Sequence, residues 1–164
     1  MATLRKSFHE GHRRKFLVVI DDTPECDRAV VYSAHRVMHS GGGLIMVYAI
    51  APSDFQHWIG VENIMRAEAN ETAEEALRKQ SERAMATCGI AAETIVREGN
   101  LAEVILELIE EDEDIAILVL AAGTDSEGPG PLVSSIAGSG SGTFPIPVTI
   151  VPGTLSDEDI AALA

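Results

Sequence analysis

Short apolar runs alternate along this chain with longer stretches in which apolar residues recur at helical spacing. The runs are rich in β-branched residues, as buried strands are, and occupy residues 16–21, 44–50, 90–98, 115–120 and 148–151. The run at 90–98 is more polar than the others, which predicts a place nearer an edge of the sheet. The remaining stretches predict helices that begin near Thr23, Glu62, Gly99, Leu132 and Ser156.

Individual residues indicate where these helices begin and end. Thr23 and Pro24 predict the start of the first helix, with the Thr23 hydroxyl group as its cap. Gly41 is expected to end it, because glycine adopts the left-handed conformation without a Cβ clash. Ser156, followed by the acidic residues 157–159, predicts a capped start for the final helix.

The order of elements predicts a single α/β domain. Strands that alternate with crossovers of helical length form a parallel sheet covered on both faces. We therefore expect a doubly wound, five-stranded, mostly parallel sheet with helices on both faces. The predicted organisation is a basic N-terminal arm over residues 1–14, the α/β domain over 15–153, and a short C-terminal helix over 154–164.

Charge is distributed unevenly over the chain, whose net charge is −14. Five Lys and Arg residues lie within residues 1–15, whereas none follows Arg97. Nucleic acids are therefore not expected as partners, because an acidic body repels phosphates. We expect the arm to be a solubilising, partly disordered tail, with a weak electrostatic contact as the alternative. The acidic run 110–114 is expected to be a solvated turn, although a cation or a basic partner could use it.

Membrane, disulfide and metal-site signals are weak in this sequence. It contains no apolar run of about 18 residues, and its N-terminus does not look like a signal peptide. Cys26 and Cys88 lie far apart, as plain thiols of a reducing compartment would, so we expect a cytoplasmic protein. His35 and His39 are spaced for chelation on one helix but have no evident third ligand, so no metal site is predicted.

The most promising place for a ligand is the point where the strand order reverses, between the first and fourth strands. Asp21, Asp22 and Thr23 follow the first strand, and residues 121–124 follow the fourth. Asp21 could accept hydrogen bonds from an adenine amine or from ribose hydroxyls. Alternatively, Asp21 or Asp22 satisfies the backbone donors of the following turn. No P-loop, dinucleotide-binding or nucleophile-elbow motif is present, and the glycine-rich segment 138–142 has neither phosphate-loop spacing.

Several local sequences resemble the universal stress protein family. Residues 15–23 (KFLVVIDDT) look like the family's first strand and its V-D-G-S turn, with Asp22 where glycine is usual. Residues 44–52 (LIMVYAIAP) are similar to its second strand, with Tyr48 where histidine is common.

The resemblance continues through the second half of the chain. Residues 98–105 (EGNLAEVI) look like the segment that opens the family's third helix, and 114–120 like the strand before its nucleotide motif. Residues 147–152 (PVTIVP) resemble the closing P-V-x-x-V-P strand. The resemblance covers about residues 13–153 and implies an adenine nucleotide alpha-hydrolase-like fold.

The nucleotide-binding members of that family carry G-x2-G-x9-G-[ST] after the fourth strand. Aligned without gaps, the motif falls on Ala121, Thr124, Ser134 and Ser135, so only the final hydroxyl is kept. Glycine lets backbone amides approach a phosphate closely, whereas the residues here add a Cβ. A shifted register would use Gly123 and break the gap-free match.

The resemblance implies a homodimeric stress-response or regulatory binding module with a degenerate nucleotide site and no catalytic residues. The alternative is a protein that binds ATP or AMP, with Mg²⁺, and hydrolyses it slowly. An enzyme that uses the acidic residues with a divalent cation is a third hypothesis. The candidate ligand-binding residues are Asp21, Thr23, Ala49, Ala121, Gly123, Thr124, Ser134 and Ser135. The partners implied are a second copy, paired through the edge residues Val148, Ile150 and Val151, and an unknown protein; neither nucleic acid nor membrane is expected.

Overall fold

The computed structural model describes residues 3–52, 59–124, 128, 130–137 and 144–164, and the glycine-rich segment 138–142 lies outside them. The five strands are β1 (Lys15–Val19), β2 (Gly43–Ile50), β3 (Glu93–Glu98), β4 (Ile115–Ala122) and β5 (Val148–Pro152). The five helices are α1 (Cys26–Ser40), α2 (Ile59–Cys88), α3 (Leu101–Glu111), α4 (Pro131–Ala137) and α5 (Asp157–Leu163).

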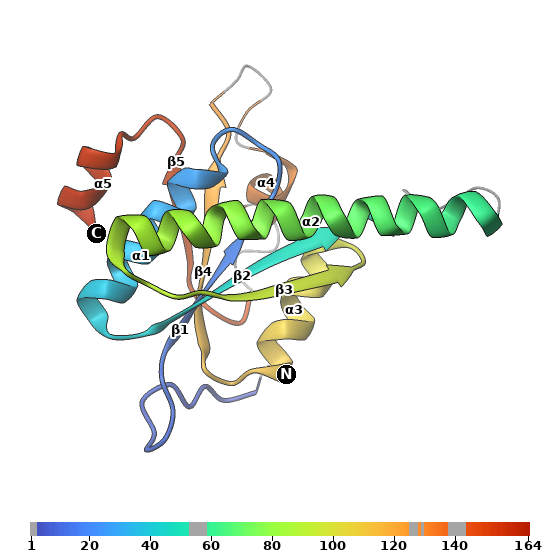
Figure 1. Ribbon diagram of the computed structural model, residues 1–164. Helices are drawn as coiled ribbons and strands as arrows, with labels where there is room; N and C mark the ends of the chain where they lie inside the picture. The colour runs from blue at the N-terminus through green and yellow to red at the C-terminus, as the bar shows by residue number, and fades with distance from the viewer. Residues whose placement is uncertain (1–2, 53–58, 125–127, 129, 138–143) are drawn as a thin grey trace.

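The strands form one sheet in the order β3-β2-β1-β4-β5, and every pair within it is parallel (Figure 1). The predicted fold class is therefore confirmed, with an all-parallel rather than a mostly parallel sheet. The polar strand β3 does lie at an edge, and β5 lies at the other. The strand order reverses between β1 and β4, as expected for a doubly wound sheet.

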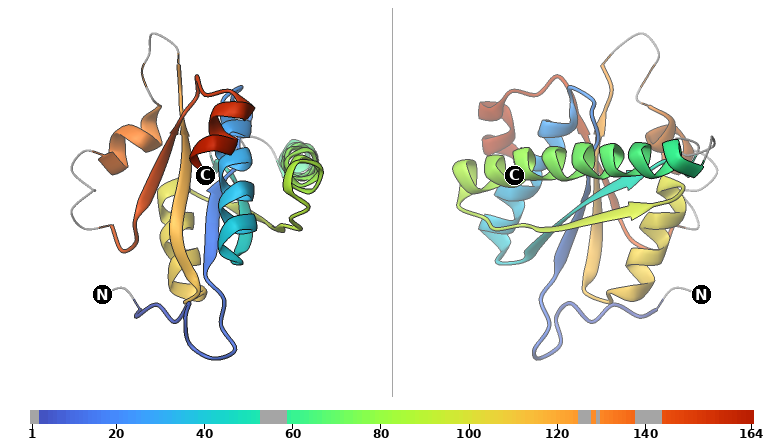
Figure 2. Two further views of the ribbon diagram at one scale, coloured as in Figure 1. Left: turned by 90° about the vertical axis from the view of Figure 1, so that its left-hand side faces the viewer. Right: turned by 45° about the vertical axis from the view of Figure 1, so that its right-hand side comes forward.

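Helices cover both faces of the sheet, with α1 and α2 on one side and α3 and α4 on the other (Figure 2). Alternate side chains of β1 point to opposite faces, as in any strand. Phe16 and Val18 therefore pack with α1 and α2, whereas Leu17 and Val19 pack with α3 and α4. The 30-residue helix α2 crosses the sheet and extends past the ends of β2 and β3 (Figure 1).

The segment after β5 folds back onto α1. Ser156 caps α5 as predicted, accepting a hydrogen bond from the Asp159 backbone while the Asp159 carboxylate accepts one from Ser156. The Arg28 guanidinium of α1 donates to the Leu155 carbonyl at 2.9 Å and pairs with Asp157. The C-terminal helix is thereby fixed to the domain.

The start of α1 differs from the prediction. Its first helical residue is Cys26, Glu25 occupies the capping position, and no side chain caps the helix. The Thr23 hydroxyl instead donates to the Asp21 carboxylate, which also accepts from the Thr23 backbone N–H at 2.9 Å. The prediction that Thr23 is the cap is wrong because Asp21, two residues earlier, engages that hydroxyl group.

The N-terminal arm is also different from the expected solvated tail. The Arg5 guanidinium donates to the carbonyls of Ile109, Asp112 and Ile115 at 2.6, 3.0 and 3.3 Å, at the end of α3 and the start of β4. Because the last carbonyls of a helix have no partner within it, a guanidinium placed there stabilises the helix end. The prediction of a partly disordered tail is therefore wrong for the described residues 3–14. The alternative, an electrostatic contact of the arm, is what the structure shows.

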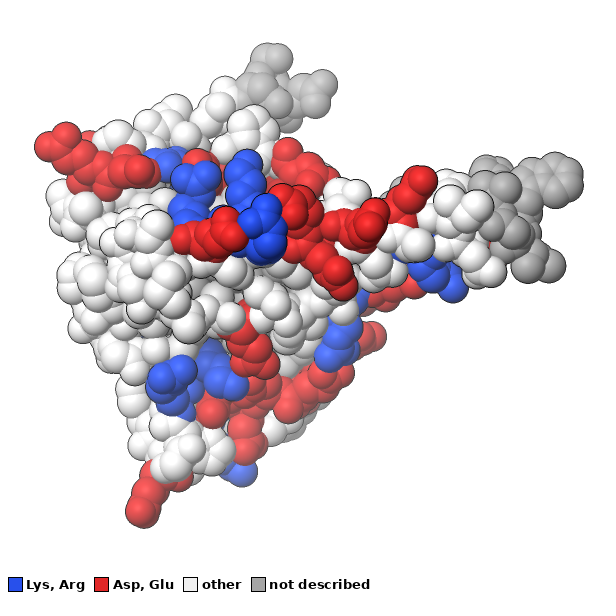
Figure 3. Space-filling model, in the orientation of Figure 1, with Lys and Arg blue, Asp and Glu red and all other residues white. Residues whose placement is uncertain are grey.

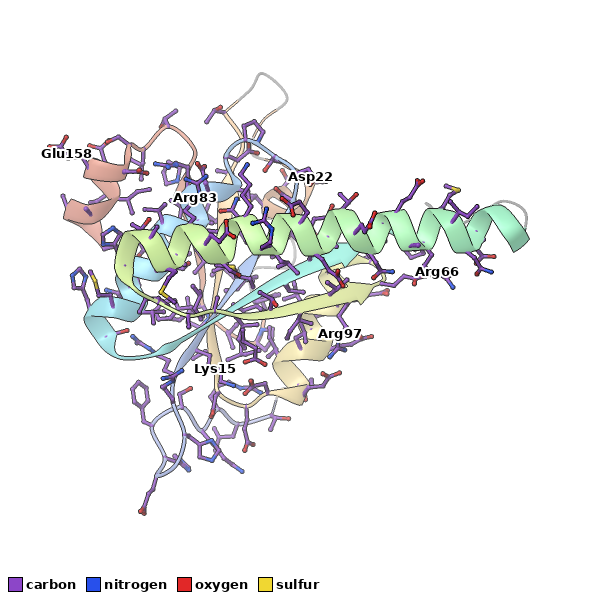
Figure 4. The ribbon with its side chains drawn as sticks, viewed as in Figure 1. Lys15, Asp22, Arg66, Arg83, Arg97 and Glu158 are labelled. Atoms are coloured by element: carbon purple, nitrogen blue, oxygen red, sulfur yellow. The ribbon has the colours of Figure 1, made fainter. Side chains whose placement is uncertain are left out.

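The acidic run 110–114 is the partner of that arm rather than a solvated turn. Ion pairs join Lys6 to Glu113 at 3.2 Å and Lys15 to Asp112 at 2.7 Å. His12 Nδ1 forms a hydrogen bond of 2.7 Å with Asp114 Oδ1. Lys15 lies with this group at the start of β1, opposite the carboxyl ends of the strands (Figure 4). The basic partner named as an alternative for this run is therefore the chain's own N-terminus.

Candidate functional site

A cavity of about 230 Å³ opens where β1 and β4 end, at the reversal of strand order. The end of β1 and the following turn supply one wall, and the end of β4 with the start of α4 supplies the other. The residues that line it are Val19, Asp21, Thr23, Glu25, Cys26, Leu101, Leu120, Ala121, Gly130, Pro131, Leu132 and Val133. We call this the switch-point cavity.

The switch-point cavity combines apolar walls with two carboxylates. Asp21 directs one oxygen, Oδ1, to both donors of Thr23, so its Oδ2 has no hydrogen bond among the described residues. Glu25 is half-buried at the start of α1, and no described residue forms a hydrogen bond or ion pair with its side chain. Both carboxylates can therefore accept hydrogen bonds from a ligand.

Two further cavities lie beside α2 at the same end of the sheet. One, of about 460 Å³, is lined by Asp21, Asp22, Thr23, Glu71, Thr72, Glu75, Ala76, Lys79 and Gln80. The other, of about 370 Å³, is lined by Asp22, Tyr48, Ala49, Ile50, Ala51, Ala69 and Thr72. The Tyr48 hydroxyl donates to Asp22 Oδ2 at 2.8 Å, which fixes the Asp22 side chain near α2 (Figure 4).

Negative charge dominates this end of the sheet. Lys79 is the one cationic side chain among the described residues that line the three cavities. It is exposed on α2, where Glu71 and Glu75 line the same cavity. On the face in Figure 3, Lys and Arg are scattered among Asp and Glu and form no continuous basic surface.

Cys26 lies at the base of the switch-point cavity but is not a reactive thiol. It is buried, and burial raises the pKa of its thiol to about 12. The thiolate is the reactive form of cysteine, and a thiol with this pKa stays protonated at neutral pH. Cys26 therefore contributes to the wall of the cavity and not to covalent chemistry.

The structure brings only some of the predicted site residues together. Asp21, Thr23 and Ala121 line the switch-point cavity, whereas Ala49 lines a cavity beside α2. Ser134 and Ser135 are exposed on α4 and line none of these three cavities.

Gly123 and Thr124 follow β4 directly and belong to the turn beyond it. Neither lines any of the three cavities. Thr124 instead lies close to Gly153, which follows β5. A Cβ added to Gly153 would lie 2.7 Å from the Thr124 methyl carbon. Thr124 therefore packs against the turn after β5, and a role for either residue in ligand binding stays a prediction.

Sequence reasoning missed Glu25 and the start of α4 as parts of the cavity. Glu25 was expected inside the first helix. It instead occupies the capping position before Cys26, the first residue of α1, and it lines the cavity. Gly130 has a φ of 107°, which glycine adopts readily, and it leads directly into Pro131 and α4. The Gly-Pro pair before a short helix was the available signal for this wall.

Metal ligation has little support in the described part of the chain. No group of three or more His, Cys, Asp or Glu side chains is placed there to hold a metal ion. The rings of His35 and His39 lie 6.2 Å apart, and His39 Nδ1 is 3.0 Å from the Ala164 carbonyl oxygen. No described helix is both long and apolar enough to cross a bilayer.

The residues expected at a dimer edge do lie on the edge strand β5. Ile150 is 37% exposed and Val148 is half-buried. Val151 is buried in the core beside α1, so its side chain is not part of the outer surface.

Comparison with known proteins gives the same fold. The model of the universal stress protein family matches residues 12–152 of this chain. The structure of a universal stress protein from Lactobacillus plantarum is similar, with a TM-score of 0.69 and 18% sequence identity. That match covers 84% of this chain and 97% of the other.

Some of the similar structures contain bound nucleotides. A universal stress protein from Archaeoglobus fulgidus in complex with dAMP has a TM-score of 0.60 and 15% identity, over 84% of this chain and 97% of the other. A family member from Arabidopsis thaliana with AMP bound has a TM-score of 0.57 and 13% identity, over 88% and 94%. Among curated proteins, the search finds no significant match.

Proposed function

Because the chain belongs to the universal stress protein family, we propose that it works as a regulatory binding module that responds to a small ligand of the adenine-nucleoside type. The observation that carries this proposal is the switch-point cavity, with apolar walls and the free oxygens of Asp21 and Glu25. Apolar walls suit a planar base, and a few placed acceptors fix its orientation. The dAMP and AMP in the two relatives add support for this class of ligand.

A binding role is favoured over catalysis by the chemistry of the lining residues. The Cys26 thiol stays protonated, and the Thr23 hydroxyl already donates to Asp21. Nucleophilic catalysis needs a nucleophile within hydrogen-bonding reach of a general base. Cys26 does not meet that requirement. The Thr23 hydroxyl does contact the Asp21 carboxylate, but that contact closes a turn within three residues, and none of the described residues that line the cavity is a Lys, Arg or His that could stabilise negative charge in a transition state. The module is therefore expected to bind its ligand without turning it over.

We also propose that the module is a homodimer in the cytoplasm. Among the described strands, β5 has a neighbour on one side only, and Ile150 leaves an apolar side chain at that edge. Exposed apolar edge strands pair readily with another strand. Cys26 and Cys88 are both free, which fits a reducing compartment.

Filling the cavity tests the ligand site. Ala121 lines it beside Leu120, so Ala121→Leu places a larger side chain inside it. Adenosine binding, measured by isothermal titration calorimetry, is expected to weaken at least about tenfold. The matched control, Ala161→Leu, alters an exposed position on α5 and is expected to bind like the parent. Equal binding by both variants would place the ligand site elsewhere.

A further inference from the structure

We infer that the ligand site, as proposed above, selects against phosphate and prefers a neutral or positively charged nucleoside-type ligand. The inference rests on the proposed function and names the charge of the ligand. Three observations at the carboxyl ends of β1 and β4 support it. Asp21 Oδ2 and the Glu25 carboxylate have no partner among the described residues, none of the described residues that line the cavity is Lys or Arg, and the positions aligned with the family's phosphate motif are not glycine.

Carboxylate oxygens of the switch-point cavity remain available to a ligand after the hydrogen bonds within the protein are made. Asp21 Oδ2 and the Glu25 side chain form no hydrogen bond with described residues. Glu25 is also half-buried, so its contacts with water are reduced. A carboxylate in such a place is stabilised by a ligand that donates hydrogen bonds or carries positive charge. Ribose hydroxyls, an amine or an amidine group meet that requirement.

Compensating cations are missing on both sides of the cavity. None of its lining residues is Lys or Arg. The sequence between β2 and α2, residues 51–58, contains neither residue type, and the whole chain after Arg97 contains neither. Lys79 lines the neighbouring cavity together with Glu71 and Glu75, and it does not line the switch-point cavity. A phosphate would therefore meet carboxylates without a balancing side chain.

The backbone does not replace those cations. The four positions that align with the family's phosphate motif carry Ala121, Thr124, Ser134 and Ser135, and only Ala121 lines the cavity. The described glycines of this loop with positive φ are Gly128 and Gly130, outside the aligned positions. At the positions where the motif would place a phosphate, side chains thus keep the backbone amides from approaching it closely.

A series of ligands that differ only in charge tests the inference. The probes are 5′-amino-5′-deoxyadenosine, adenosine and AMP, measured by calorimetry without Mg²⁺ at neutral pH. The amino compound is expected to bind most tightly and AMP at least about tenfold more weakly than adenosine, because like charges at this range repel. Raising the salt concentration should strengthen AMP binding, weaken binding of the amino compound and leave adenosine nearly unchanged.

Neutral variants assign the effect to the two carboxylates. The double variant Asp21→Asn with Glu25→Gln is expected to improve AMP affinity about tenfold and to remove the advantage of the amino compound. The control is Glu158→Gln, which removes one charge from exposed α5, away from the cavity (Figure 4). The control should keep the order of the three probes.

The outcomes separate this inference from the proposed function. If AMP binds more tightly than adenosine and its binding weakens with salt, the charge preference is wrong and the nucleoside site stands. If none of the probes binds to folded protein, the proposed function itself fails. An unchanged probe order in the double variant would also overturn the role given to Asp21 and Glu25.

Discussion

Gly153 lies where the ends of β4 and β5 meet the start of α1. A Cβ at this position would lie 2.6 Å from the Ala122 carbonyl oxygen and 3.0 Å from the Glu25 Cβ. The first contact is with backbone, which cannot turn aside as a flexible side chain would. Gly153 therefore allows the turn after β5 to approach the wall that contains Glu25.

Substitution of Gly153 by Ala is expected to lower the free energy of unfolding by about 1–3 kcal/mol, as overpacking does in other proteins. Urea denaturation at neutral pH measures the change. Thr154→Ala serves as the control, because Thr154 is exposed next to it. A fully stable Gly153→Ala protein would mean that the turn relaxes freely.

At the residue scale, short-range chemistry was predictable and spatial proximity was not. The Ser156 cap follows from residues adjacent in sequence, and it was confirmed. Thr23 failed as a cap because Asp21 competes for its hydroxyl, a choice between two local hydrogen bonds that composition does not decide. The roles of Glu25 and Gly153 depend on three chain segments that meet only in the folded domain.

At the element scale, the contact between the N-terminal arm and the end of α3 is the least predictable feature. A helix that ends in acidic residues has an unfavourable charge at the negative end of its dipole. Arg5 offsets this by donating to the Ile109 and Asp112 carbonyls. The basic arm and the acidic run 110–114 can both be recognised in the sequence. Their contact cannot, because no periodic pattern relates residues about a hundred positions apart.

Carboxyl groups in this contact make it sensitive to acid. Burial raises the pKa of Asp114, but hydrogen bonds from His12 and the Arg13 backbone, with the charges of His12 and Lys15, outweigh it and hold that pKa below its usual range. Hydrogen bonds from Thr3 lower the pKa of Glu110. A carboxyl whose pKa is lowered by folding stabilises the folded state above its ordinary pKa, and that contribution disappears as pH falls through the lowered value.

Asp114→Asn is therefore expected to be less stable than the parent at neutral pH, with a difference that disappears as the pH falls through the lowered pKa of Asp114. Urea unfolding at a series of pH values measures both proteins. Glu10→Gln, an exposed acid in the same arm, should follow the parent at every pH. A difference that grew on acidification would contradict the sign of the Asp114 contribution.

At the scale of the whole molecule, the order of elements was predictable because hydrophobic periodicity depends on neighbouring residues alone. The polar run at 90–98 was correctly expected near an edge, as β3. The helix expected from Glu62 to Cys88 is α2, which starts three residues earlier, at Ile59. Its passage beyond the sheet was not predicted, because helical spacing of residues does not say how a helix lies on a sheet. Gly89, with a φ of 68°, marks its end.

The two edges of the sheet offer a matched test of the proposed dimer. Ile150→Lys on β5 is expected to convert a dimer into a monomer, because a charge at the interface would be buried. Thr94→Lys on β3, the opposite edge, is expected to leave the assembly unchanged. Sedimentation velocity distinguishes the two forms. A dimer that survives Ile150→Lys and dissociates with Thr94→Lys would assign the interface to β3.

The docked arm also determines an order of events during synthesis. Arg5 leaves the ribosome early, but its acceptors at Ile109, Asp112 and Ile115 are added more than a hundred residues later. At ordinary rates of translation, that interval is roughly 5–20 s. The arm is thus synthesised well before the residues that it binds. In a nascent chain that stops before Ile109, the three carbonyl acceptors of Arg5 have not yet been made.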